Sequence, residues 1–359
     1  MFRKITTKKR IIFFCVYSTL ILLLILLGTG GAKTCRALEE MRLTYLLLAC
    51  LLAFIMTLVD ALRLQVLTNA LSTPVSFFYN YKTLLAYYFL SAITPTASGG
   101  EPLMIYMLKE KGVGVGKGTA IVVIRGILVI FFIALTGPLI IYTQQDLLAN
   151  SILLYAFKIV AGILLVLITS LVYALYNPKH MEYLLEKGLH LLDKIPYFKK
   201  HSPHIVKKLD DWIEELNFSL KYFIRKKKMS LFWAAVLTVL FLLCNYSLAY
   251  VILKGLNADI SLVRVLMLQV VLYFLLYFSP TPGGSGVAEG GFYMLFGPHV
   301  PQHILGILII LWRFFTTYLW VILGGLVIMK TLGIDQVETF AEEELKPVLE
   351  IENDTMSTQ

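Results

Sequence analysis

Long apolar runs ended by polar residues dominate the hydrophobic pattern of the chain. A helix needs about 20 apolar residues to cross the hydrocarbon core of a bilayer, which is about 30 Å thick. Six runs reach or approach that length, at residues 11–27, 43–66, 119–142, 152–176, 231–253 and 304–329. The first lacks an A-x-A-like cleavage site, so we expect a retained span rather than a secretory signal. The pattern therefore predicts an all-α, polytopic integral membrane protein with six full spans.

Two further apolar regions, 82–108 and 261–297, are each interrupted in the middle by Pro, Gly, Ser and Thr. The first interruption reads Thr94-Pro-Thr-Ala-Ser-Gly-Gly-Glu-Pro102, and the second reads Ser279-Pro-Thr-Pro-Gly-Gly-Ser-Gly-Val-Ala-Glu-Gly-Gly291. Irregular backbone at membrane depth is tolerated only where it is buried in protein or lines a wet cavity. We expect two re-entrant hairpins whose tips face such a cavity.

The surroundings of the two interruptions keep the same spacing. In each copy a polar residue lies 35 residues before the first proline, and an arginine lies 24 residues after the glutamate. The residues are Asp60, Pro95, Glu101 and Arg125 in the first copy, and Asn245, Pro280, Glu289 and Arg313 in the second. The spacing predicts an internal repeat, with one copy at about 43–142 and the other at about 231–329.

The distribution of Lys and Arg predicts which ends of the spans face the cytoplasm. The N-terminus and the loop 177–230, which has twelve Lys and Arg against seven acids, are basic and therefore predicted to be cytoplasmic. The same loop alternates apolar and basic residues and predicts amphipathic helices on the inner surface. The acidic tail at 331–359 is predicted to be cytosolic. This assignment makes the two copies inverted, as in transporters whose site lies near the bilayer midplane.

Composition agrees with a membrane protein and excludes several other classes. Apolar residues make up 58% and charged residues 15% of the 359 residues, against about 45–50% and about 25% in soluble domains. The net charge of +9 belongs to membrane ends and does not indicate nucleic-acid binding. The four cysteines include no CxxC pair, so neither a disulfide framework nor a metal site is expected. No cofactor and no catalytic residue is predicted.

Charged residues inside spans cost about 2.5–3.5 kcal/mol each by insertion scales, so each requires an explanation. We expect Glu101 to pair with Arg125, and Glu289 with Arg313. One interpretation is that these ion pairs only fasten each hairpin to a span. The other is that the arginines bind a lipid phosphate bidentately, and that the glutamates compete for the arginines when the site is empty. Asp60 and Arg63 can pair along one helical face, although Arg63 is expected to snorkel toward the membrane surface. Lys158 is expected either to snorkel or to pair locally. All these charged residues lie within the predicted apolar segments.

The two tips supply glycines for close backbone approach and hydroxyl groups that can donate to an anion. The alternative is that Pro and Gly only make tight turns. The complete set of candidate substrate-binding residues is Asp60, Ser98, Gly99, Gly100, Glu101, Arg125, Asn245, Thr281, Gly283, Gly284, Ser285, Glu289 and Arg313.

The run Pro280-Thr-Pro-Gly-Gly-Ser-Gly-Val-Ala-Glu289, with Arg313 in the following span, resembles the signature of the lysylphosphatidylglycerol synthase/flippase transmembrane family. The resemblance covers roughly residues 8 to 330. In full-length members, called multiple peptide resistance factors, it implies a membrane region that translocates aminoacylated phosphatidylglycerol and a separate C-terminal domain that makes this lipid. Because about 30 residues follow the last predicted span here, we expect no synthase domain.

Two functions follow from the residues and the resemblance together. The first is a flippase-like lipid translocase of the plasma membrane, which moves a phospholipid such as lysyl-phosphatidylglycerol, or another phosphate-bearing lipid, between leaflets. Its partners would be an anionic or aminoacylated phospholipid and a separate lipid synthase. The alternative is a phosphatidylglycerol lysyltransferase, or another membrane-embedded lipid-modifying transferase, linked to cationic peptide resistance.

Overall fold

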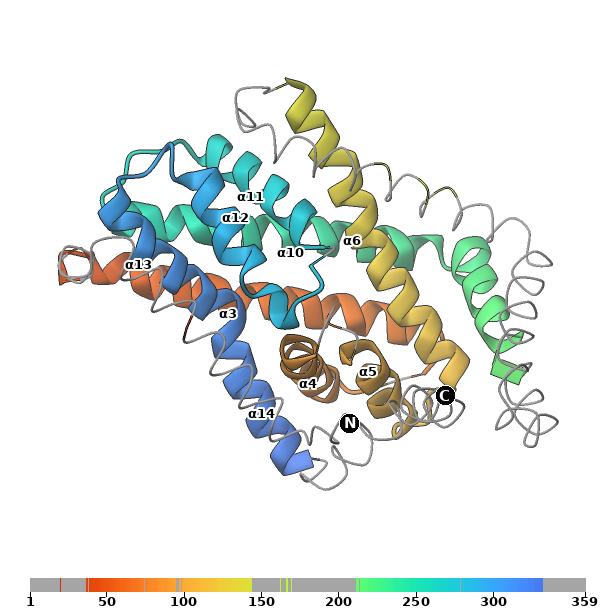
Figure 1. Cartoon of the computed structure of the whole chain (residues 1–359). Helices are drawn as coiled ribbons and strands as arrows, with labels where there is room; N and C mark the ends of the chain where they lie inside the picture. The colour runs from red at the N-terminus through yellow and green to blue at the C-terminus, as the bar shows by residue number, and fades with distance from the viewer. Residues whose placement is uncertain are drawn as a thin grey trace, which may run out of the picture.

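The structure is a computed structural model of the whole chain. It describes residues 39–143 and 211–331, apart from Pro74, Pro95, Thr96, Ser98, Ile213 and Phe278, together with a few isolated positions. Every regular element within these ranges is helical (Figure 1), which confirms the all-α prediction. The predicted spans at 11–27 and 152–176, and Lys158 within the second of them, lie outside these ranges.

Four helices in the described ranges are long and apolar enough to cross a membrane, and they match four of the predicted spans. Each extends its predicted run by two to four residues at one or both ends. They are α3 (Leu43–Ala70), α6 (Val115–Thr143), α10 (Lys228–Gly255), and a composite of α13 (Gln302–Arg313), the π-helical turn η4 (Phe314–Tyr318) and α14 (Leu319–Thr331). The chain is therefore an integral membrane protein.

Both interrupted regions form two packed α-helices, and the α-helix is interrupted at the tip between them. The first consists of α4 (Phe77–Ile93) and α5 (Gly100–Lys109), and the second of α11 (Leu262–Leu276) and α12 (Val287–Phe296). The second tip contains the short 3-10 helix η3 (Pro282–Gly284), and its glycines at 283, 284 and 286 have positive φ. These angles are open to glycine and strained for other residues, which explains the glycine-rich sequence of this tip.

The helices of the two predicted copies follow one another in the same order, and several helix ends keep one offset. Helices α3 and α10 both have 28 residues and begin 185 residues apart. Each is followed by a residue with left-handed backbone, Ser72 (φ 56°) and Asn257 (φ 57°), again 185 residues apart. The next helix in each copy begins after a serine whose hydroxyl accepts a backbone N–H at the helix start, Ser76 and Ser261. This offset aligns residues that the sequence pattern alone did not compare.

The two copies interlock rather than fold separately. Helices α3 and α10 lie side by side and antiparallel (Figure 1), and the Arg42 N–H at the start of α3 donates to the Gly255 carbonyl at the end of α10 (3.1 Å). Helix α4 packs on α14 of the other copy, and α11 packs on α6. Because each hairpin rests on a span of the opposite copy, the core belongs to both.

The described end of the 177–230 loop is a helix at 214–226 that contacts the start of α6. Its buried side chains are Leu216, Ser219, Leu220 and Phe223. Glu215 accepts the free N–H of Gly116 in the first turn of α6 (2.8 Å), where a carboxylate also opposes the positive end of the helix dipole. The predicted amphipathic helix is therefore present in this part of the loop and caps a membrane-spanning helix.

Candidate functional site

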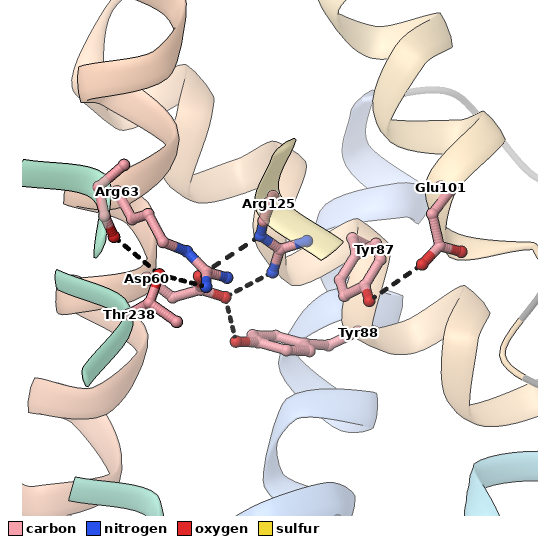
Figure 2. A network of polar contacts seen from close by, with 8 residues as sticks. Asp60, Arg63, Tyr87, Tyr88, Glu101, Arg125 and Thr238 are labelled. Carbon is pink, nitrogen blue, oxygen red and sulfur yellow. Dashed lines mark hydrogen bonds and ion pairs between the residues drawn. The ribbon is translucent and has the colours of Figure 1, made fainter. Parts of the chain in front are cut away.

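The carboxylate of Asp60 joins three helices of the first copy and, through Arg63, a helix of the second (Figure 2). It is fully buried and accepts hydrogen bonds from Arg125 Nη2 (2.6 Å) and from the Tyr88 hydroxyl (2.6 Å). It also forms an ion pair with Arg63, one helical turn away. Arg63 Nη1 in turn donates to Thr238 Oγ1 on α10 (3.2 Å). Asp60 thus holds two buried cations and links α3, α4, α6 and, through Arg63, α10.

This network corrects two expectations about the first copy. Arg63 does not snorkel, because it is 1% exposed and bonded to Asp60 and Thr238. Arg125 pairs with Asp60 rather than with Glu101. The ring of Tyr87 lies between the two (Figure 2): its centroid is 4.4 Å from the Arg125 guanidinium carbon, and its hydroxyl is 3.4 Å from Glu101 Oε1. A buried carboxylate nearer to Arg125 therefore replaces the expected partner.

Gly100 allows the Tyr87 ring to occupy this place. A Cβ added at Gly100 would come within 2.8 Å of the Tyr87 ring and within 1.9 Å of Ser91 Oγ. Any side chain at this position would push the ring or the α5 backbone away. Gly100 therefore has a packing role beside the site rather than a direct role in it.

The second copy forms the expected pair between Glu289 and Arg313. Arg313 Nε lies 2.7 Å from Glu289 Oε1, and both residues are buried. The other guanidinium nitrogens donate to the Gly283 carbonyl (3.1 Å each), to Ser285 Oγ (3.0 Å) and to Thr317 Oγ1 (3.2 Å). Every nitrogen of Arg313 thus has a partner, and three of these partners belong to the second tip or to the start of α12. Arg313 fastens that tip to its span.

Differences at equivalent positions explain why the two arginines choose different partners. The 185-residue offset places Asn245 opposite Asp60, Leu248 opposite Arg63 and Leu272 opposite Tyr87. Asn245 keeps the tyrosine contact, since Tyr273 donates to its Oδ1 (3.1 Å) as Tyr88 donates to Asp60. However, its neutral amide cannot neutralise a guanidinium. Without a second carboxylate, Arg313 takes the glutamate of its own hairpin.

A cavity of about 440 Å³ lies between the two hairpin tips. Its charged lining residues are Glu101 and Arg313, and most of the remaining lining residues are aromatic or carry a hydroxyl group. The aromatic residues are Tyr87, Tyr88, Tyr273, Tyr277, Trp312 and Trp320, and the aliphatic hydroxyl groups come from Ser91, Ser279, Thr281, Thr316 and Thr317. Both copies contribute, so the cavity exists only because the two hairpins meet.

The predicted site residues fall into three groups around this cavity. Those that line it are Glu101, Thr281, Gly283, Gly284 and Arg313. Those that position lining residues are Asp60, Gly100, Arg125, Asn245, Ser285 and Glu289. Gly99 instead donates its N–H to Thr94 Oγ1 within the first tip, and Ser98 lies outside the described residues. Arg125 is not a lining residue, so the two arginines do not converge on one space.

The aromatic wall was missed by the sequence analysis. Tyr88 and Tyr273 follow Asp60 and Asn245 by 28 residues each, so the repeat spacing contained a signal that could have identified them. The contributions of Trp312 and Trp320 follow only from tertiary packing. Within the described part of the chain, no group of three His, Cys, Asp or Glu residues could hold a metal ion.

Comparison with known proteins shows the family to which the chain belongs. Residues 11–324 match the family described as the lysylphosphatidylglycerol synthase TM region. The chain is also similar to a UPF0104 membrane protein of Archaeoglobus fulgidus, at 27% identity over 288 residues that cover 78% of this chain and 84% of the relative. The matched span includes both hairpins, both arginines and the cavity between them. The chain therefore belongs to the family of the lysylphosphatidylglycerol synthase transmembrane region.

Proposed function

We propose that this protein is a lipid translocase, which moves a phosphate-bearing lipid headgroup between the two leaflets of the plasma membrane. One observation carries the proposal: a polar cavity lies between the tips of two broken helices from interlocking copies of one motif. Broken helices that meet around a polar space are characteristic of transporters with a central site. A headgroup could enter this cavity while its acyl chains stay in lipid.

The proposed membrane arrangement has six full spans, two re-entrant hairpins and cytoplasmic termini. The described helices supply four of the spans, and the apolar runs at 11–27 and 152–176 would supply the others. The repeats then have opposite orientation, so the first tip enters from the cytoplasm and the second from outside. Residues 1–330 form one transmembrane unit in this arrangement, followed by the acidic tail.

Arg313 and the hydroxyl groups of the second tip are the proposed phosphate ligands. Arg313 lines the cavity, and Ser279 and Thr281 lie there within 2.9 Å of each other. In the structure Glu289 occupies one edge of the guanidinium, so a phosphate would have to compete with this carboxylate. Such competition would release the second tip when lipid binds. The substrate would be an anionic, zwitterionic or aminoacylated phospholipid, made by a separate lipid synthase.

Filling the cavity is expected to stop translocation without unfolding the protein. Thr281→Trp adds an indole at the second tip, whereas Leu135→Trp adds the same group to an exposed position of α6. After reconstitution into vesicles with acyl-labelled fluorescent lipids, dithionite bleaching should show at least a tenfold lower transbilayer rate for Thr281→Trp only. Equal rates for wild type and a folded Thr281→Trp variant would contradict a headgroup path through this cavity.

The transferase alternative makes a different prediction for the same protein. A transferase would create a new headgroup, and a carboxylate such as Glu101 would serve as its base. Neither histidine nor cysteine lines the cavity, so no observation in the described residues favours this chemistry over translocation. Lipids extracted from an expressing host would contain a new aminoacyl or glycosyl lipid if the alternative is correct.

A further inference from the structure

Glu101 is the charged residue of the cavity that lacks a counter-ion. It is half-buried, lines the space between the tips, and accepts one long hydrogen bond from the Tyr87 hydroxyl (3.4 Å). No lysine or arginine nitrogen in the described part of the chain lies within 4.0 Å of its carboxylate. Its equivalent, Glu289, is in contrast 1% exposed and paired with Arg313. The equivalent glutamates thus differ: Glu289 has a counter-ion, and Glu101 has none among the described residues.

Two neighbouring residues keep Glu101 open. Asp60 supplies the carboxylate that Arg125 would otherwise seek from Glu101. Tyr87 places its ring between the two groups (Figure 2). The second copy has Asn245 and Leu272 at these positions, and there the glutamate is paired. Leaving a carboxylate unpaired at membrane depth is costly, and the first copy contains two separate features that maintain this state.

The cavity wall around Glu101 suits a cation. Tyr87 and Tyr277 line the cavity together with Glu101, and Tyr88, Tyr273, Trp312 and Trp320 complete its aromatic surface. Aromatic faces attract ammonium groups through their quadrupole, and sites for choline-like ligands commonly combine such rings. Arg313, the cavity's other charged residue, is already neutralised by Glu289. The charge left to attract a ligand is therefore negative.

We propose that Glu101 and the adjacent tyrosines form a subsite for an alkylammonium group, so that the preferred lipid is zwitterionic rather than purely anionic. This assignment rests on the proposed translocation of a phosphate-bearing headgroup, whose phosphate would lie toward Arg313 at the second tip. Asp60 and Tyr87 act as positioning residues, because they keep Arg125 away from Glu101. The first copy would then bind the ammonium end of the headgroup, and the second copy would bind the phosphate.

Soluble headgroup analogues test the subsite without any lipid transport. Choline and ethanolamine should bind the purified wild-type protein in detergent, measured by calorimetry and by the fluorescence of Trp312 and Trp320. The neutral analogue 3,3-dimethylbutan-1-ol has the shape of choline without its charge and should bind at least tenfold more weakly. Comparing choline with ethanolamine distinguishes a methylated from a primary ammonium. Equal binding of choline and the neutral analogue would overturn the assignment.

Glu101→Gln removes the charge and nearly preserves the shape, and Glu214→Gln removes a charge from the exposed face of the 214–226 helix. In vesicles, wild type and Glu214→Gln should move acyl-labelled phosphatidylcholine faster than phosphatidylglycerol. Glu101→Gln should reduce this ratio about tenfold, the size expected for a lost charge-assisted contact. A ratio unchanged in folded Glu101→Gln would overturn the subsite and leave translocation standing.

The two proposals fail in different ways. If wild type moves no lipid faster than protein-free vesicles, translocation is wrong, and the choline measurement still decides the ammonium subsite. If both lipids move equally fast in wild type, translocation stands and the zwitterionic preference is wrong. If Glu101→Gln does not fold, the comparison of choline with its neutral analogue on wild type decides.

Discussion

Asp60→Asn is expected to lower the free energy of unfolding by about 3–5 kcal/mol, the range for removing one partner of a buried ion pair. The reason is the number of groups that depend on one carboxylate. Arg63 and Arg125 are both buried and both pair with Asp60, and the Tyr88 hydroxyl donates to it. A neutral amide would leave two cations without a charge partner. Chemical or thermal unfolding in detergent micelles measures the loss.

Asp259→Asn provides the matched control, because Asp259 is fully exposed to solvent and forms an ion pair with the partly exposed Lys254. Exposed pairs contribute little to stability, so this variant should unfold like wild type. An equal effect of the two substitutions would contradict the role assigned to the Asp60 network.

The repeat predicts which second substitution restores part of the stability that Asp60→Asn removes. Asp60→Asn combined with Arg63→Leu gives the first copy the residues of the second, Asn245 and Leu248. One uncompensated arginine is removed, and Arg125 becomes free to pair with Glu101 as Arg313 pairs with Glu289. The double variant should therefore be more stable than Asp60→Asn alone. If the losses of stability caused by Asp60→Asn and Arg63→Leu simply add in the double variant, Arg125 does not exchange Asp60 for Glu101.

Gly324→Ala is expected to destabilise the protein by about 3 kcal/mol, at the upper end of the usual cost of overpacking. A Cβ at Gly324 on α14 would lie 2.2 Å from the Leu85 carbonyl oxygen on α4. Since backbone cannot rotate away as a side chain does, the two helices would have to separate. Their contact joins the first hairpin to the last span of the other copy, so the tips and the cavity should also shift.

Gly126→Ala in α6 makes the same chemical change in an open position, since no atom lies within 4 Å of the added Cβ. Alanine is the better helix former by about 1 kcal/mol, so this control should be as stable as wild type or more stable. Both variants can be followed by thermal unfolding in the same detergent. Stability of Gly324→Ala equal to that of the control would contradict the close packing of α4 on α14.

Several features of the fold could be predicted from sequence because they depend on local patterns. An apolar run long enough to cross a bilayer forms a helix in lipid whatever its neighbours are, since its backbone must satisfy its own hydrogen bonds. Clusters of Pro and Gly disfavour a continuous helix, and both predicted interruptions are tips between packed helices. The equal spacing around Glu101 and Glu289 drew attention to Glu101 and Arg313, and both line the cavity.

The partners of those charged residues could not be predicted in the same way. A buried arginine pairs with the carboxylate that tertiary packing brings closest, and sequence spacing suggested Glu101 for Arg125. The structure places Asp60 of α3 there instead and inserts the Tyr87 ring before Glu101. The aromatic wall likewise depends on α4, α11 and the last span meeting around one space.

The sequence by itself determined the class of protein and its family signature, and it predicted two related copies, because hydrophobic length, motif and spacing are properties of the chain. Only the tertiary structure decided that the copies differ in charge state at the cavity. Asp60 and Asn245 occupy equivalent positions and differ by a carboxylate against an amide. This difference changes the ion pairing of Glu101 and Glu289, which lie 41 and 44 residues later in the sequence. Coulomb pairing depends on distances in space, and these distances are set when the helices pack.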